Sequence, residues 1–298
     1  MPGYQKVKTA FKVDFVGVGA RKAGTTWIAD CLWEHPEICI SQPKEVNYFN
    51  EILTTLLGIP NKNYGKPLGW YMRHYAHCKM GAIKGEYCVS YLKDPKAAHV
   101  IHSFFPETKI IIGLRDPVDR AYSDYNMFHH YVSRDDSPTF EEAIRKNENY
   151  LKSSRYAEDL ERYLGLFGKD RVHCILLDDI KKDPNTVVSS LYAFLNVDSS
   201  FQPQALWGTS NESKVARFRY FGRFVFHSKR FLVRLRLNGL LEFLKRTGLD
   251  QPLMKIGAKE QAFGRVEPKT RRDLIPYFMG DIEKVESLLQ RDLSAWKQ

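Results

Sequence analysis

The chain has 298 residues, of which 43% are hydrophobic and 13% aromatic, enough apolar mass to bury one large core. Lysine and arginine outnumber aspartate and glutamate by 45 to 35, and the resulting formal charge of +10 suits a polyanionic ligand. No stretch approaches the roughly 18 uninterrupted apolar residues of a membrane span, which excludes a membrane-spanning helix from the expected elements. We therefore expect one α/β domain over residues 1–298.

The cysteines predict a reducing environment. There are five, an odd and scattered set without a C-x-x-C pair: Cys31, Cys39, Cys78, Cys88 and Cys174. This pattern contains no zinc or redox motif and is typical of reduced thiols in a cytosolic protein. The segment before Val13 carries lysines but lacks the apolar core of a signal peptide, so we predict a cytoplasmic protein.

The first predicted unit is a strand, a tight loop and a helix. Val13–Val18 is a β-favouring run that meets Gly19, and a helical pattern begins after Gly24 and stops at Pro36. His35, at the end of this helix, is predicted to cap or pack rather than to catalyse. One face of the helix is apolar: Trp27, Ile28, Cys31 and Leu32.

The loop between this strand and helix predicts an anion site. Glycines at the carboxyl end of a strand let backbone amides curl around a phosphate, and the helix N-terminus adds its positive dipole end. A Walker A motif needs lysine directly after its last glycine, where Thr25 stands. A dinucleotide fingerprint needs a third glycine where Lys22 stands. The first mismatch argues against a P-loop triphosphatase, and the second argues against a dinucleotide-dependent dehydrogenase.

A second unit begins with Ile110–Leu114, read as a buried strand. Asp116 supplies an N-cap and Pro117 the first position of a helix with a buried face. Arg115 and Ser123 offer a planar fork of donors and a hydroxyl, which together suit a dianionic phosphate. The alternative is that Arg115 only pairs with Asp119.

The third unit is a helix over Ala157–Phe167, closed by Gly168 and followed by a strand over Val172–Leu177. Strands that alternate with helices predict a central, mostly parallel sheet flanked by helices on both faces. Asp178 and Asp179 follow the last strand like a Walker B motif, but without the Walker lysine we expect them to cap the next turn.

The loop sequence Arg-Lys-Ala-Gly-Thr-Thr-Trp resembles the 5′-phosphosulfate loop, Lys-x-Gly-Thr-Thr, of sulfotransferases that use 3′-phosphoadenosine 5′-phosphosulfate (PAPS). Arg115 and Ser123 resemble that family's 3′-phosphate site. The resemblance implies a P-loop-like α/β fold, PAPS as sulfonate donor and Lys22 as the catalytic lysine. It also implies donor contacts from both motifs: Arg21, Lys22, Ala23, Gly24, Thr25, Thr26, Trp27, Arg115 and Ser123.

Further segments resemble the Golgi heparan sulfate sulfotransferases and their bacterial relatives. Lys44–Phe49 resembles their Glu-Val-His-Phe-Phe segment, and Leu68–Tyr71 resembles their Gly-Trp-Tyr. The resemblance implies that Glu45 is the general base. Other candidates for this role are Glu86, His77 and His74. The alternative interpretation of Glu45 is a surface carboxylate that pairs with Lys44. Gly264 and Arg265 resemble part of the family's Lys-Gly-Arg cofactor loop.

Two departures leave the acceptor open. Asn47 stands where those enzymes have histidine, and Tyr87 stands where their Glu-Lys-Thr-Pro-x-Tyr segment has a lysine. The resemblance therefore implies a small-molecule or glycan acceptor without deciding between a carbohydrate, a lipid or polyketide hydroxyl, another alcohol and an amine. We interpret the irregular residues 50–80 and 202–265 as insertions that shape the acceptor cleft.

The chemistry implied is an in-line displacement at sulfur, and because the transferring group is a monoanion we expect no divalent metal. No nucleic acid is expected as partner. The basic, apolar segment 217–246 predicts either contact with an acidic or membrane surface or an ordinary amphipathic helix. Two other functions stay open: a P-loop kinase or nucleotide phosphotransferase, and a basic module that binds polyanions.

Overall fold

The fold is taken from a computed structural model, which describes residues 11–54, 58–131, 135–207, 214–216, 258–260 and 264–298. The basic segment 217–246 lies outside the described residues. Among the helices of the described ranges, none combines the length and apolarity needed to cross a bilayer.

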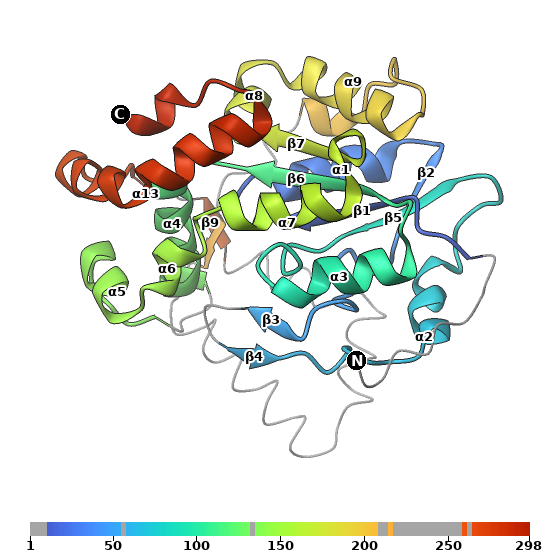
Figure 1. The fold of residues 1–298 in the computed structure, drawn as a ribbon, viewed down its shortest axis with the longest axis horizontal. Coiled ribbons are helices and arrows are strands. Elements are labelled where there is room, and N and C mark those ends of the chain that lie inside the picture. The colour runs from blue at the N-terminus through green and yellow to red at the C-terminus, as the bar shows by residue number, and fades with distance from the viewer. Residues whose placement is uncertain (1–10, 55–57, 132–134, 208–213, 217–257, 261–263) are drawn as a thin grey trace.

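The core of the fold is a parallel sheet of five strands in the order β2-β5-β1-β6-β7 (Figure 1). Its strands are β1 (Phe15–Gly19), β2 (Ile38–Ile40), β5 (Ile83–Tyr87), β6 (Lys109–Leu114) and β7 (Val172–Leu176). Every neighbouring pair in this sheet runs parallel. The predicted parallel sheet is confirmed, and each strand presents its carboxyl end at the same edge.

Helices cover both faces of this sheet. The principal ones are α1 (Thr25–Glu34), α3 (Pro95–Phe104), α4 (Pro117–Asn126), α7 (Ala157–Phe167), α8 (Leu177–Lys182), α9 (Pro184–Leu195) and α13 (Pro268–Leu289). Figure 1 shows α3 and α7 in front of the sheet and α1 behind it, and α9 packs on the same face as α1. Alternate strand residues supply the two cores: Val16 and Ile110 face α3 and α7, whereas Phe15 and Ile111 face α1 and α9.

Smaller elements complete the described part of the chain. They are α2 (Leu68–Met72), α5 (Phe140–Lys146), α6 (Asn149–Lys152), the hairpins β3 (Ile52–Thr54) with β4 (Ile59–Pro60) and β8 (Lys214–Ala216) with β9 (Ala258–Glu260), the π-helical turn η2 (Met127–Tyr131), and the 3₁₀ turns η1 (Arg73–Tyr75), η3 (Lys169–Arg171), η4 (Gln204–Leu206) and η5 (Ser294–Lys297).

The predicted helix ends agree with the structure. The Asp116 carboxylate accepts from the Asp119 amide at 2.9 Å and caps α4, and α7 ends before Gly168. His35 is buried at the end of α1, where its ring packs against Tyr192 and Phe201. The last predicted strand is one residue too long, because Leu177 already belongs to α8.

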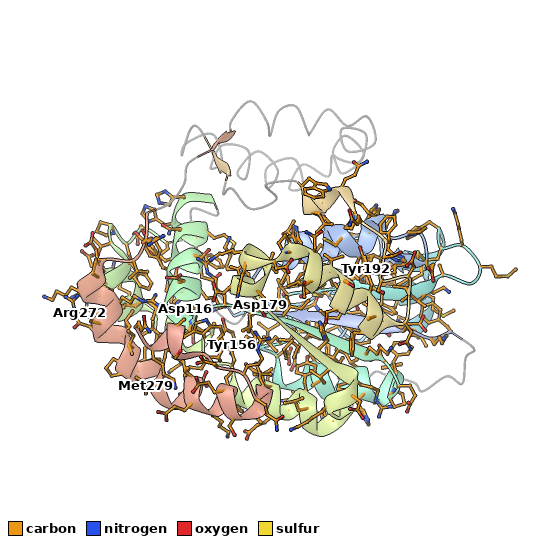
Figure 2. All side chains as sticks on the ribbon, turned by 90° about the horizontal axis from the view of Figure 1, so that it is seen from above. Asp116, Tyr156, Asp179, Tyr192, Arg272 and Met279 are labelled. Atoms are coloured by element: carbon orange, nitrogen blue, oxygen red, sulfur yellow. A yellow bond between two sulfur atoms is a disulfide. The ribbon has the colours of Figure 1, made fainter. Side chains whose placement is uncertain are left out.

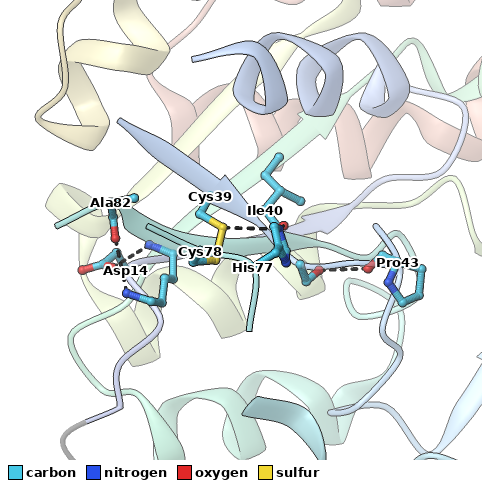
Figure 3. Close-up of a disulfide and its surroundings, with 9 residues drawn as sticks. Asp14, Cys39, Ile40, Pro43, His77, Cys78 and Ala82 are labelled. Atoms are coloured by element: carbon cyan, nitrogen blue, oxygen red, sulfur yellow. Dashed lines mark hydrogen bonds between the residues drawn. A yellow bond between two sulfur atoms is a disulfide. The ribbon is translucent and has the colours of Figure 1, made fainter. Parts of the chain in front are cut away.

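The expectation of five reduced cysteines is wrong for one pair. Cys39 on β2 and Cys78 after η1 form a disulfide, whereas Cys31, Cys88 and Cys174 are free thiols (Figure 3). The two cysteines lie 39 residues apart in the chain and meet only because the segment after η1 runs beside β2. Spacing along the sequence cannot show such a contact. The cytoplasmic location, which depended partly on reduced thiols, stays a prediction.

Replacing both Cys39 and Cys78 by serine is expected to lower the free energy of unfolding by about 4 kcal/mol. The reason is that the bridge closes a long loop of the unfolded chain and restricts its conformations. Urea denaturation of the oxidised protein and the double variant measures the effect, with Cys174→Ser as the control for loss of a thiol. Equal midpoints for both proteins would contradict the prediction.

Candidate active site

The largest concentration of predicted site residues lines a cavity of about 650 Å³ at the carboxyl edge of the sheet. Each strand of the sheet leads into it: the loop after β1 supplies Lys22, the segment after β2 supplies Glu45, and Arg115 follows β6 directly. Val89 follows β5, and Ile180 lies on α8 after β7. The chain leaves β1 toward β2 on one side and later returns to β6 on the other. Such a reversal of strand order creates a crevice in which α/β proteins bind ligands.

The loop after β1 is shaped to hold an anion. Lys22 and Gly24 have left-handed backbones, with φ of 69° and 78°, and Gly24 is the N-cap of α1. A Cβ at Gly24 would lie 3.0 Å from Ile180 and 3.1 Å from Leu177, so glycine is favoured there by space as well as by conformation. The first amides of α1 have no acceptor within the helix and are available to a bound anion.

Lys22 lines the cavity as a strained and partly buried cation. Burial lowers its pKa below the ordinary lysine value, and the nearby Arg115 and Arg21 lower it further, whereas Asp124 opposes them. No carboxylate in the described part of the chain forms a salt bridge with Lys22. An unpaired ammonium in such a place is ready to bind an anionic ligand.

Arg21 lines the cavity and also connects the loop after β1 to α4. Its guanidinium binds Asp124 through two bonds of 2.8 and 2.9 Å, although part of the residue lines the cavity. Arg120 donates to the same carboxylate at 3.0 Å and to the Arg21 carbonyl at 3.1 Å. The buried Asp124, between two guanidiniums, has a pKa below its ordinary range despite the opposing effect of burial. We therefore assign Arg21 a structural contribution to the loop after β1.

Arg115 and Ser123 also line the cavity, Arg115 directly after β6 and Ser123 on α4. One Arg115 nitrogen donates to the Lys22 carbonyl at 3.3 Å, and its buried Nε has no hydrogen-bond partner among the described residues. The alternative partner Asp119 binds Arg271 instead, at 3.1 Å. Arg115 thus keeps donors for a ligand.

Glu45 and Lys44 form the other charged part of the cavity lining. Burial raises the pKa of Glu45 above its ordinary value, while Lys44 and Arg21 oppose that rise. The Lys44 ammonium lies 5.6 Å from the centre of the Tyr87 ring, and its own pKa is lowered by burial. Glu45 is therefore a half-buried carboxylate facing the cavity and not the solvent-exposed half of a surface pair.

The other candidate bases do not line this cavity. Glu86 is fully buried, and the hydroxyls of Tyr71 and Tyr91 donate to it. His74 contacts the Gln42 carbonyl at 2.8 Å, and His77 contacts the Ile40 carbonyl at 3.1 Å beside the disulfide (Figure 3). The geometry thus leaves Glu45 as the one of these four candidates that borders the anion loop's cavity.

The remaining predicted residues divide into two groups. The cavity lining includes Gly24, Thr25, Thr26 and Gly264. It does not include Ala23, Trp27 or Arg265. Trp27 is buried, and its indole nitrogen donates to the Ala205 carbonyl at 3.0 Å. Its position in the motif therefore reflects packing of α1.

Sequence reasoning missed Asn126 and Lys181, which also line the cavity. Asn126 lies one helical turn after Ser123 on α4, so this spacing was the available signal. Its amide nitrogen is buried and has no acceptor within the described ranges. A buried donor without a partner is costly, and a bound ligand would supply the acceptor.

The acidic pair after β7 faces away from the cavity. The Asp178 carboxylate accepts from the Trp296 indole at 3.0 Å, and Asp179, labelled in Figure 2, pairs with Arg291 at 2.9 Å. Leu177 and Ile180 of the same helix line the cavity instead. Within the described residues, the one cluster with metal-ligand geometry is Cys39, His77 and Cys78, whose sulfurs form the disulfide.

Fold and site together define an α/β protein with an anion loop at the carboxyl edge of a parallel sheet and a carboxylate facing the same cavity. A family model described as the sulfotransferase domain matches residues 12–215. The chain therefore belongs to the sulfotransferase domain family.

Individual relatives agree with this family. The chain is 28% identical over 200 residues to a bifunctional heparan sulfate N-deacetylase/N-sulfotransferase 1 of Caenorhabditis briggsae, covering 62% of this chain and 22% of that protein. It is 27% identical over 189 residues to human heparan sulfate glucosamine 3-O-sulfotransferase 3B1, covering 60% and 45% respectively. The matches thus span less than half the length of either relative.

A solved structure extends the likeness over almost the whole chain. A sulfotransferase from Alicyclobacillus acidocaldarius superposes with a TM-score of 0.67 at 26% identity, covering 97% of this chain and 100% of that one. The predicted P-loop-like α/β fold is therefore confirmed.

Proposed function

We propose that this protein transfers the sulfonate group of PAPS to an acceptor hydroxyl. The observation that carries the proposal is that Lys22, Arg115, Ser123 and Glu45, which come from separate segments of the chain, line one cavity. Three of these side chains can bind the two ends of a doubly phosphorylated donor, and the fourth can accept a proton. Membership of the sulfotransferase domain family supports the same reaction.

The proposed donor lies along the carboxyl edge of the sheet. Its 5′-phosphosulfate would bind Lys22 and the first amides of α1, and its 3′-phosphate would bind Arg115 and Ser123. The unpaired Arg115 nitrogen and the left-handed turn at Gly24 support this orientation. A single domain over the whole chain is part of the same proposal.

The reaction would be one in-line displacement. The acceptor oxygen forms a bond to sulfur while the bond from sulfur to the bridging oxygen breaks, and adenosine 3′,5′-bisphosphate leaves. Negative charge grows on the bridging oxygen, where the Lys22 ammonium and the α1 amides stabilise it. Glu45 takes the proton from the acceptor hydroxyl. This step moves a monoanionic group and needs no divalent metal.

The acceptor is proposed to be a hydroxyl of a glycan or of another small molecule. The names of the relatives support a glycan, since both act on heparan sulfate by their descriptions. Tyr87 stands in place of the heparan sulfate enzymes' lysine and has a structural role. Its ring packs so closely on Gly17 that a Cβ added to Gly17 would lie 2.3 Å from the ring. The Lys44 ammonium over this ring supplies a cation beside Glu45.

A calorimetric titration with adenosine 3′,5′-bisphosphate, ATP and 5′-AMP tests the donor assignment. We expect one bisphosphate per chain, weaker binding of AMP, and no requirement for magnesium, because the 3′-phosphate site is the distinguishing feature. Magnesium-dependent ATP binding would support a nucleotide phosphotransferase instead. Salt-sensitive binding of polyanions without bisphosphate binding would support a polyanion-binding module.

Arg115→Ala is expected to weaken bisphosphate binding by about 2 to 4 kcal/mol, since it removes a charged partner from a partly desolvated phosphate. Arg271→Ala is the matched control. Arg271 binds Asp116 and Asp119 at the N-terminus of α4, close to Arg115 in sequence, but does not line the cavity. Titration of both variants measures the effect. Affinity equal to that of the unmodified protein in Arg115→Ala would show that Arg115 has no role in the donor site.

A further inference from the structure

Glu86 is a fully buried carboxyl in the middle of a hydrogen-bonded tyrosine cluster. One of its oxygens accepts from the Tyr71 hydroxyl at 2.8 Å and from the Tyr91 hydroxyl at 3.0 Å. The Tyr71 and Tyr75 hydroxyls are 2.7 Å apart. The second carboxyl oxygen has no hydrogen-bond partner among the residues the structure describes.

This cluster is connected to the segment that carries Glu45. The Tyr91 hydroxyl that donates to Glu86 also accepts from the Tyr48 amide at 2.8 Å. The Tyr91 hydroxyl therefore links the buried Glu86 carboxyl to the backbone three residues after Glu45.

The surroundings of Glu86 favour its neutral form. Burial raises its pKa to about 8, against the hydrogen bonds from Tyr71 and Tyr91, and the negative charge of Glu45 raises it further. The other titratable groups that face it are Tyr75 from η1 and Cys88, which follows β5. Both have pKa values well above their ordinary range, so they are neutral beside it.

We propose that Glu86 is a positioning residue that, through the Tyr91 hydroxyl, fixes the segment bearing Glu45. This inference rests on the proposed function of Glu45 as general base. A neutral Glu86 adds no second negative charge near Glu45, whereas an ionised Glu86 raises the pKa of Glu45 and disturbs the cluster. Glu86 is fully buried and does not belong to the cavity lining, so its proposed effect acts through other residues.

The test compares Glu86→Gln, Glu86→Ala and Tyr91→Phe, with Glu51→Gln as the control for removing an exposed carboxylate. Glutamine resembles the protonated acid and keeps an oxygen for both tyrosines, so we expect turnover within about threefold of the unmodified enzyme near pH 7. Tyr91→Phe and Glu86→Ala remove the connection, and we expect turnover to fall roughly 10- to 100-fold with bisphosphate affinity unchanged. The acidic limb of their pH profile should also move.

Two results would overturn the inference. A loss in Glu86→Gln as large as that in Glu45→Gln would make Glu86 a base in its own right. Unchanged turnover and an unchanged acidic limb in Tyr91→Phe would show that the cluster does not position Glu45. If Glu86→Ala does not fold, the other two variants still decide.

A readout without activity tests the protonation state. Because the folded pKa of Glu86 lies above the ordinary value of 4.5, its contribution to stability is complete below pH 4.5 and is lost as the pH rises to about 8. The melting temperature of Glu86→Gln relative to the unmodified protein should therefore rise between pH 5 and pH 8. Parallel curves would contradict a protonated Glu86. Failure of the proposed function itself looks different, since the unmodified protein would then neither bind bisphosphate nor turn over PAPS.

Discussion

Glu45→Gln is expected to lower turnover by roughly 10²- to 10⁴-fold while donor affinity stays nearly unchanged. Glutamine keeps the shape of the side chain and removes its basicity, and in the proposed mechanism Glu45 contacts the acceptor's proton rather than the donor. Turnover is measured with a known acceptor, or at first as slow release of adenosine bisphosphate from PAPS, where only large effects count. Titration of the bisphosphate measures donor affinity.

The same variant should change the pH profile. A base must be deprotonated, so activity rises with pH through the pKa of Glu45, which burial places above its ordinary value of 4.5. Lys22 must be protonated, and its lowered pKa places the alkaline limb below the ordinary value of 10.5. Glu45→Gln should lose the acidic limb and keep the alkaline one. Near-normal turnover with both limbs intact would remove Glu45 from the reaction.

Lys22→Ala is expected to lower turnover by about 10²- to 10³-fold and also to loosen the donor by tenfold or more. In the proposed mechanism, Lys22 contacts the donor's sulfonate end before the reaction and binds it more strongly as charge develops on the leaving oxygen. Lys169→Ala is the matched control, because Lys169 is an exposed lysine that precedes β7, at the opposite edge of the sheet. A Lys22→Ala enzyme with full turnover would contradict the assigned role.

The two substitutions must therefore differ in kind. Loss of Lys22 affects both donor binding and turnover, whereas loss of Glu45 affects turnover alone. If both variants weakened bisphosphate binding equally, the division of the cavity into a donor part and an acceptor part would be wrong.

The parts of the site that follow strands directly could be predicted from sequence. Lys22 and Gly24 belong to a loop between a strand and a helix, and Arg115 comes immediately after the strand Lys109–Leu114. Parallel strands end at one edge, so their following residues meet. The helix caps at Asp116 and Gly168 were local signals for the same reason, because a cap is decided by residues within one turn.

Contacts between distant segments could not be predicted. Arg21 lines the cavity as a predicted donor contact, but the pairing of its guanidinium with Asp124, which is 103 residues away, could not be predicted. Tyr87 was recognised only as a departure from a lysine position, whereas its ring packs on Gly17 of the neighbouring strand. The Cys39–Cys78 disulfide likewise depends on which distant segment of the chain lies beside β2. Each of these residues has a role set by a partner that no local pattern identifies.

The measurement that tests the central claim most directly follows the sulfur of ³⁵S-labelled PAPS. Incubation with the unmodified enzyme and a panel of glycan and small-alcohol acceptors should release adenosine bisphosphate and leave the label on an acceptor, or slowly on water. Lys22→Ala should slow this release by about 10²- to 10³-fold, and Lys169→Ala should leave it unchanged. PAPS that stays intact with every acceptor, or a release that is equally fast in Lys22→Ala, would contradict sulfonate transfer at this cavity.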